Sequence, residues 1–108
     1  MNVLERDISK KWIHDHLRDH PADYAYRIID TPWGGAKPFD WFLFCEGIAW
    51  ALEFKVERRK TFKYSISELP AHQYSELLKF MNGKERKSQV VIYHESTEEW
   101  HTLEIHKT

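Results

Sequence analysis

The sequence predicts an α/β protein, an αβ-sandwich in which a central mixed sheet is flanked by helices. Residues 2–20 carry apolar side chains at three- and four-residue spacing, which is typical of an amphipathic helix. Residues 41–45 and 48–56 are apolar at successive positions, so strands there would have both faces covered. A second helical segment follows these strands. Helices before and after such strands favour a sheet packed between them.

The first helix has a start signal and a stop signal. Asn2 can cap it, with Glu5 at the third helical position, and Pro21 helps to end it. The second helix begins in the run Ser67-Glu-Leu-Pro-Ala and ends at Asn82-Gly83. The predicted strands are 25–30, 41–45, 48–56, 89–94 and 100–105, the second helix is 67–81, and loops are expected at 31–38 and 57–67.

Length and composition limit the classes of protein to consider. A chain of 108 residues suits one domain with a modest core, and an aromatic content of 15% excludes disorder on compositional grounds. The net charge of −1 gives no global sign of a nucleic-acid partner, so only local charge can indicate one. Cys45 is the single cysteine, which excludes an intrachain disulfide and any zinc site that needs several thiolates.

No targeting or membrane segment is predicted. Residues 1–11 are charged and lack the apolar region of a signal peptide. The apolar stretch 41–54 contains Glu46 and Glu53 and is too short to span a bilayer. Because the single cysteine also suits a reducing compartment, we expect a cytoplasmic protein without a membrane partner.

The central inference comes from the turn between two strands. If Glu46-Gly47 is a two-residue hairpin turn, the numbers of opposite residues sum to 93, and Asp40 lies opposite Glu53. Opposite residues point to the same face, and Lys55 shares that face because it is two positions beyond Glu53. Three charged side chains are therefore expected at one end of an apolar hairpin.

Two carboxylates placed this closely repel each other and need compensation. At least one would have a raised pKa or bind a cation, and oxygen ligands suit Mg²⁺ or Mn²⁺. Lys55 could partly neutralise the pair or orient a water molecule. The alternative is a structural ion pair at the end of a sheet, and spacing alone does not decide between the two.

These residues also carry a family resemblance. Pro38-Phe39-Asp40, followed by Glu53-Phe54-Lys55, resembles the motif of the PD-(D/E)XK nucleases, in which Phe39 would be an insertion between proline and aspartate. The resemblance implies a restriction-endonuclease-like core in which Asp40, Glu53 and the Phe54 carbonyl bind Mg²⁺. It implies that Lys55 positions or activates the attacking water.

Three further stretches resemble one branch of that superfamily, the RecU-like and phage-type Holliday-junction resolvases. They are Lys60-Thr61-Phe62, Ala71-His72-Gln73 and Leu4-Glu5-Arg6. By this resemblance Glu5 is a further acid near the metal and Gln73 is a polar residue of the active site. From the sequence alone, Glu5 could instead be a capping residue and Gln73 an exposed residue at a helix start.

A basic segment follows the predicted catalytic strand. Between residues 55 and 63 five basic residues stand against one acid, Glu57, and such local charge is typical of contacts with DNA phosphates. The alternative is a solvated loop. The residues predicted to bind DNA are Lys37, Arg58, Arg59, Lys60, Thr61 and Lys63.

The predicted function is Mg²⁺-dependent endonucleolytic cleavage of DNA, with branched DNA as the expected substrate and a homodimer supplying two sites. Two alternatives remain: a nuclease of the same fold acting on flap, fork or duplex DNA, and a non-catalytic DNA-binding module. The seven histidines contain no His-Glu-x-x-His motif, and only His16 and His20 have metal-ligand spacing on the first helix, so we expect surface or packing roles. Size and resemblance are compatible with a phage or plasmid protein.

Overall fold

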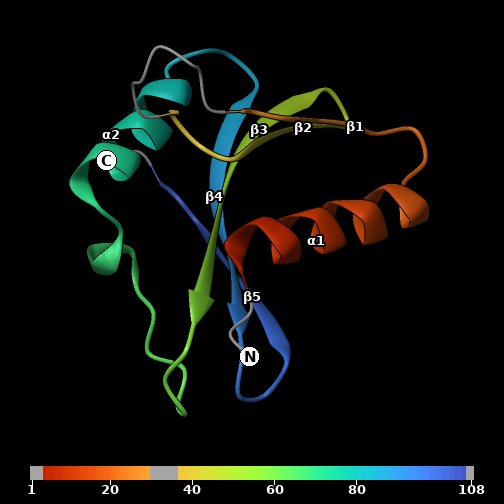
Figure 1. Cartoon of the computed structure of the whole chain (residues 1–108). Helices are drawn as coiled ribbons and strands as arrows, with labels where there is room; N and C mark the ends of the chain where they lie inside the picture. Colours follow the sequence, from red (N-terminus) through yellow and green to blue (C-terminus); the bar gives the residue numbers. More distant parts are fainter. Residues whose placement is uncertain (1–3, 30–36, 107–108) are drawn as a thin grey trace.

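The computed structural model describes residues 4–29 and 37–106 (Figure 1). The described elements are α1 (Glu5–Asp19), β1 (Tyr24–Arg27), β2 (Trp41–Cys45), β3 (Ile48–Glu57), the 3₁₀ turn η1 (Ile66–Glu68), α2 (Ala71–Phe80), β4 (Arg86–His94) and β5 (Glu99–Glu104). The element order agrees with the predicted one. No helix in this described part of the chain is long and apolar enough to cross a bilayer.

The strands form one sheet in the order β1-β2-β3-β4-β5. β3 and β4 run parallel and are joined by a connection that contains α2, while the other neighbouring strands pair antiparallel. The predicted mixed sheet is therefore confirmed. Its longest ladder is the β3–β4 pair, which forms the centre of the fold.

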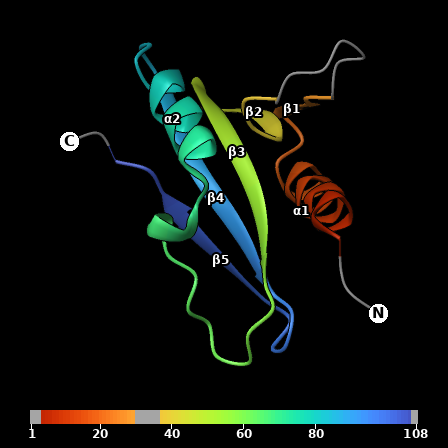
Figure 2. The ribbon, with the colours of Figure 1, turned by 60° about the vertical axis from the view of Figure 1, so that its left-hand side comes forward.

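The two helices cover opposite faces of the sheet, as Figure 2 shows. On one face α2 packs through Leu77 against a core that includes Ala51 and Val90. On the other face α1 packs through Ile8 and Ile13 against a second core. That second core also contains Leu43, Leu52, Phe54 and Val91. Alternate residues of β3 thus contribute to different cores, which is why residues 48–52 of this strand are apolar at successive positions.

The hairpin turn has the predicted length and register. Glu46 has φ 52° and Gly47 has φ 79°, and positive values at both central residues define a two-residue turn of the type I′ class. The pairs run from Cys45–Ile48 to Trp41–Leu52, which confirms the predicted sum of 93. The strict ladder stops there, because the Asp40 N–H donates to the Leu52 carbonyl at 3.0 Å. The prediction that Asp40 pairs directly with Glu53 is therefore wrong, since the chain departs from the ladder one residue earlier.

The start of the first helix also differs from the prediction. α1 begins at Glu5, and Leu4 is the N-cap residue without a side-chain capping hydrogen bond. Glu5 is thus the first helical residue and not the third, so the predicted capping box is wrong. Asn2, its expected cap, lies outside the described residues. The Glu5 carboxylate is consequently available for another role.

The second helix is shorter than predicted because Pro70 interrupts the segment. Proline disfavours helical backbone in the residue before it, and Leu69 has the extended angles φ −67° and ψ 130°. The sequence therefore forms the turn η1 and then α2, which starts directly after Pro70.

Two strand boundaries differ as well. The strand predicted at 89–94 begins three residues earlier, because β4 starts at Arg86, where parallel pairing with β3 supplies backbone partners. β1 ends at Arg27 and not at residue 30. Residues 30–36, which include most of the loop predicted at 31–38, lie outside the described range.

Candidate active site

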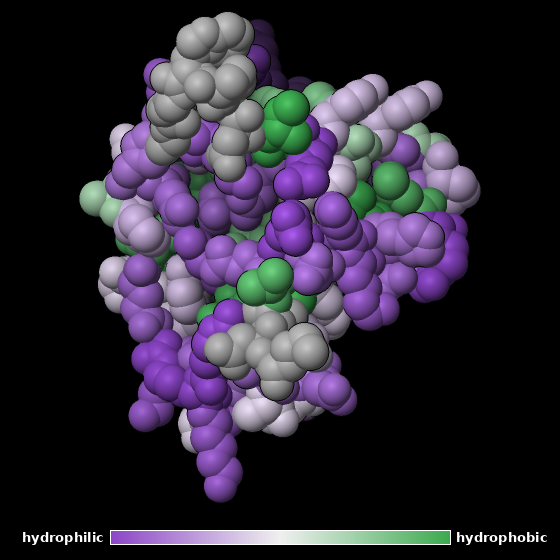
Figure 3. All heavy atoms as spheres, in the orientation of Figure 1, coloured by the Kyte–Doolittle hydropathy of each residue, from purple (hydrophilic) through white to green (hydrophobic). Residues whose placement is uncertain are grey.

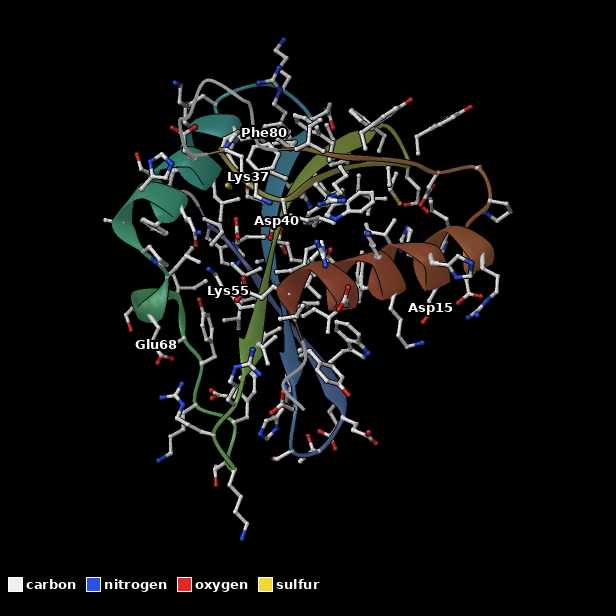
Figure 4. All side chains as sticks on the ribbon, in the orientation of Figure 1. Asp15, Lys37, Asp40, Lys55, Glu68 and Phe80 are labelled. Atoms are coloured by element: carbon white, nitrogen blue, oxygen red, sulfur yellow. The ribbon has the colours of Figure 1, made fainter. Side chains whose placement is uncertain are left out.

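The site forms where a short strand ends beside a long one. β2 has five residues and β3 has ten, so among the described residues β3 has no antiparallel neighbour on that side beyond Leu52. A cavity of about 290 Å³ lies at this opening. Residues from both helices and three strands or their flanks line it: Glu5, Arg6, Ser9, Arg27, Lys37, Asp40, Trp41, Glu53 and Gln73. In Figure 4, Lys37, Asp40 and Lys55 lie in this central region, between the start of α1 and α2.

Asp40 is held by its neighbours on both sides. Phe39 is buried and packs edge-on against Phe42 and Phe80, which anchors the chain immediately before the aspartate. The Phe54 N–H donates to Asp40 Oδ2 at 2.8 Å. Lys37 Nζ lies 3.0 Å from Asp40 Oδ1. The Asp40 carboxylate therefore accepts a backbone N–H of β3 that a neighbouring strand would otherwise accept, at the point where β2 has ended.

Glu53 is a buried acid in contact with a second acid. The residue is only 3% exposed, and Lys55 Nζ lies 3.9 Å from Glu53 Oε1. Burial, followed by the charge of Asp40 and a hydrogen bond with it, raises the pKa of Glu53 from 4.5 to about 9, although Lys55 opposes the shift. Without a cation, the pair thus favours keeping a proton on Glu53.

Glu5 belongs electrostatically to the same cluster. Although the residue as a whole is exposed, its carboxyl group faces the cavity from the first turn of α1. Partial burial raises the pKa of Glu5, Lys55 opposes this, and Asp40 adds to it. The structure therefore brings Glu5 to the acids as the family resemblance implies.

Gln73 contributes an acceptor without a partner. It is the third residue of α2 and lines the cavity opposite α1. Its Oε1 atom is buried and has no hydrogen-bond partner in the described part of the chain. A buried amide oxygen is costly to leave unsatisfied, so a ligand, a water molecule or a cation is expected to complete it.

The donor set fits a hard divalent cation. Asp40 and Glu53 offer carboxylate oxygens, and Gln73 offers its unpartnered amide oxygen. The Phe54 carbonyl lies on the same side of β3 as the Phe54 N–H, which faces Asp40. Oxygen-only donors suit Mg²⁺ and Mn²⁺, and a cation would offset the repulsion that raises the pKa of Glu53.

Most of the basic segment lies away from this cavity. Of the residues predicted to bind DNA, Lys37 alone lines it. Arg58 forms an ion pair with Glu95 at 2.7 Å, and Arg59 binds Glu57 and Glu68. Lys60, Thr61 and Lys63 are exposed in the turn that follows β3, at the lower end of the molecule in Figure 1.

Arg59 has an internal partner of its own. Its Nε and Nη2 atoms each lie 2.7 Å from an oxygen of Glu57, which is 2% exposed. The same carboxylate accepts the backbone N–H groups of Arg59 and Lys63, both at 3.0 Å. These hydrogen bonds, chiefly those of Arg59, lower the pKa of Glu57 to about 2. Arg59 therefore organises the turn, which leaves its guanidinium engaged within the protein.

Arg59→Ala is expected to destabilise the fold, because it leaves a buried carboxylate without its cation. The midpoint of urea denaturation should fall clearly at pH 7, whereas Lys60→Ala, an exposed cation in the same turn, should leave it unchanged. Glu57 contributes stability above its ordinary pKa of 4.5 and loses it as the pH falls toward 2. The difference between wild type and Arg59→Ala should therefore shrink in acid. Equal midpoints at pH 7 would contradict this role.

Four residues of the cavity were missed by sequence reasoning: Arg6, Ser9, Arg27 and Trp41. Arg6 and Ser9 lie one helical turn apart on α1, and Arg27 ends β1 opposite Trp41. Ser9 accepts a hydrogen bond from Trp41 Nε1 at 3.1 Å, which fixes α1 against the hairpin. Arg6 could have been found from its place beside Glu5. No local pattern marks Arg27, because its position depends on the β1–β2 register.

The surface around the site is polar. Figure 3 shows that the face containing the starts of α1 and α2 is predominantly hydrophilic, while hydrophobic residues gather at upper right, over β1 and β2. Arginine and lysine side chains on the cavity wall would suit a phosphate-bearing substrate.

Comparisons with known proteins bear on the fold. No protein-family model and no curated protein matches the chain. Among solved structures, it is similar to Hjc of Archaeoglobus fulgidus, a Holliday junction resolvase from an archaeal hyperthermophile, with a TM-score of 0.57 and 21% identity. The similarity covers 88% of this chain and 75% of that chain. At this identity it shows a shared fold, and the predicted restriction-endonuclease-like core is confirmed.

Proposed function

We propose that this chain is a Mg²⁺-dependent endodeoxyribonuclease that cleaves branched DNA in the manner of a Holliday-junction resolvase. The observation that carries the proposal is the side-chain contact between buried Glu53 and Asp40, beside Lys55, at the open edge of β3. Lys37 lies beside Asp40 and Lys55 lies beside Glu53, yet the pKa of Glu53 stays raised in spite of Lys55. Two acids in contact, with a third nearby, are better explained by a cation that binds between them.

Asp40, Glu53 and the Phe54 carbonyl would hold Mg²⁺, and Mn²⁺ could replace it. When bound, the ion supplies charge stabilisation at the scissile phosphate and lowers the pKa of the attacking water. The Phe54 N–H and Lys37 hold the Asp40 carboxylate in a single orientation. Gln73 adds its unpartnered acceptor on the α2 side of the cavity.

Lys55 is proposed to orient the attacking water. Its side chain is 14% exposed and lies on the same face of β3 as Glu53. An ammonium group there can donate to a water molecule or to an oxygen of the scissile phosphate. Glu5, which lines the cavity from α1, is a further acceptor that can orient the same water.

Arg6 and Arg27 are proposed to bind the phosphates that flank the cut. The double substitution Arg6→Ala, Arg27→Ala should weaken DNA binding on any sequence, because phosphate contacts carry no base information. The slope of log K against log salt should become shallower by about 0.9 for each DNA phosphate that the variant no longer neutralises. Arg18→Ala, at the other end of α1, is the matched control. An unchanged slope in the double variant would remove both arginines from the interface.

Branched DNA is proposed as the substrate because the shared fold is that of a resolvase. Symmetric cleavage of two strands needs two sites, which a homodimer supplies. The exposed apolar residues Tyr24, Tyr26, Ile29 and Phe44 lie on or next to edge strand β1 and its neighbour β2, where a second copy could pack. Sedimentation of the purified protein should show a dimer.

A cleavage assay tests the proposal. Wild type and Glu53→Ala are incubated with labelled four-way junction, flap, fork, duplex and single-stranded DNA, in Mg²⁺ or in EDTA. Metal-dependent, symmetric nicking of the junction that Glu53→Ala abolishes is the expected result. Cleavage of another substrate alone would keep the nuclease and reject the resolvase. Binding without cleavage in Mg²⁺ or Mn²⁺ would leave a DNA-binding module with a structural ion cluster.

A further inference from the structure

A second group of metal-ligating side chains lies at the opposite end of α1 from the acids. His16, Asp23 and Cys45 each offer one ligand atom, and the three atoms lie within 4.8 Å of one another. His16 Nε2 is 2.7 Å from Asp23 Oδ2, and Cys45 forms a hydrogen bond with the same carboxyl group. The side chains are partly buried but remain accessible to an ion from solvent, since those of His16 and Asp23 are 17% and 8% exposed.

Three separate segments bring these residues together. His16 is in the last turn of α1, and Asp23 follows the helix in a turn where its N–H donates to the His20 carbonyl at 3.0 Å. Cys45 is the last residue of β2. The β1–β2 register, in which Tyr24 pairs with Phe44, places Asp23 one position further along, beside Cys45. Since the position of α1 is set by its packing on the sheet, the cluster is held by the fold and not by one flexible loop.

The donors differ in kind from those of the acid cluster. A thiolate, an imidazole and a carboxylate are the ligands that Zn²⁺ takes, with bonds of about 2.0–2.3 Å in tetrahedral geometry. Such bonds put ligand atoms roughly 3–4 Å apart, so the present spacing needs only small side-chain movements. The carboxylate and carbonyl oxygens at Asp40 and Glu53 suit Mg²⁺ instead.

We propose that His16, Asp23 and Cys45 bind one zinc ion that links the end of α1 to the paired strands β1 and β2. Three protein ligands leave the fourth position to water. The His20 ring stacks on His16, with 4.5 Å between the ring centroids, and so turns its face toward that imidazole. The single cysteine is sufficient here, because the site needs only one thiolate.

This site is independent of the proposed nuclease activity. His16 and Glu5 are eleven residues apart on one helix, a rise of roughly 16 Å. Figure 4 shows Asp15, the neighbour of His16, at the far end of α1 from Lys55. Variants of one site can therefore be prepared without altering the ligands of the other.

The test uses the full chain, stripped of metal, and titrated with Zn²⁺ against a chelator of known affinity. Co²⁺ is the spectroscopic probe, because a cobalt–thiolate bond absorbs in the near ultraviolet. Wild type should bind one zinc ion, show the thiolate band and melt at a higher temperature with zinc. Cys45→Ser should bind zinc roughly tenfold or more weakly. It should also lose the cobalt–thiolate band and the rise in melting temperature with zinc. His14→Ala, an exposed histidine on the same helix, should change none of these.

Three outcomes would overturn the proposal. The first is that the wild type binds no zinc. The second is that Cys45→Ser binds zinc as tightly as the wild type does. The third is that Asp40→Asn abolishes zinc binding while Cys45→Ser keeps it, which would assign the ion to the acid cluster. Asp23→Asn is the second site variant, in case Cys45→Ser does not fold. It should weaken zinc binding while keeping the cobalt–thiolate band at saturating Co²⁺, and unchanged affinity in a folded Asp23→Asn protein would also count against the site.

Discussion

Glu53→Gln is expected to reduce the rate of DNA cleavage on the order of 10²–10³-fold, while the protein stays folded. The substitution preserves the shape of the side chain in a residue that is 3% exposed, but it removes the charge that would bind the cation beside Asp40. The measurement is single-turnover cleavage of the best substrate from the cleavage assay, in saturating Mg²⁺. DNA affinity should change little, because the arginines on the cavity wall are untouched.

Glu99→Gln is the matched control for this result. Its side chain is 68% exposed on β5, so it removes the same charge from the surface and should cleave at the wild-type rate. Lys55→Met keeps the length of the lysine stem and should also be slow. Wild-type cleavage by Glu53→Gln would exclude this carboxylate from the chemistry and return it to a structural role.

The same substitution is expected to stabilise the metal-free protein. At neutral pH the unfolded chain ionises this residue freely, whereas the folded protein must either keep the proton on Glu53 or hold a buried charge beside Asp40. Glutamine removes that cost. Thermal and urea unfolding in EDTA should therefore show Glu53→Gln as the more stable protein, although its cleavage is expected to be the slower.

The stability gain should depend on pH in a defined direction. Below about pH 4.5 Glu53 is protonated in both states, so the variant and the wild type should differ least there. As the pH rises, the unfolded state loses the proton while the folded state keeps it, and the wild type loses stability toward pH 9. The free-energy difference between Glu53→Gln and the wild type should therefore grow from about pH 4.5 to neutral pH.

Mg²⁺ should narrow this difference in stability, because an ion held by Asp40 and Glu53 would bind the native wild type and not its unfolded chain. Glu99→Gln should show neither the gain nor its pH dependence, since its side chain is largely exposed. A Glu53→Gln protein that is less stable than wild type in EDTA at pH 7 would mean that the native fold already satisfies the Glu53 carboxylate.

The chain's local features could be predicted because short-range geometry determines them. The two-residue turn at Glu46-Gly47 sets the hairpin register, and the period of two then places Glu53 and Lys55 on one face. The acids and the lysine could thus be grouped before any tertiary contact was known. Where the ladder stops could not be predicted, because Asp40 leaves it to accept the Phe54 N–H.

The tertiary structure decided the roles that depend on helix packing. A sequence shows Glu5 three residues after Asn2, and that spacing also suits a cap, but the start of α1 at Glu5 frees the carboxylate for the cavity. Arg59 stands in a basic run, yet a buried Glu57 and the nearby Glu68 engage its guanidinium. In both cases the competing partner is local in sequence, and only the folded backbone selects between the options.

The sequence by itself thus determined the fold class, the register of the hairpin and the grouping of Asp40, Glu53 and Lys55 at one end of it. Strand alternation and turn geometry act over a few residues, so a short stretch of sequence is enough to predict them. Only the tertiary structure brought Arg27 to that cavity and joined His16 to Asp23 and Cys45. These contacts depend on the β1–β2 register and on how α1 packs on its face of the sheet. Packing is set by the summed burial of many side chains, which no spacing between two residues records.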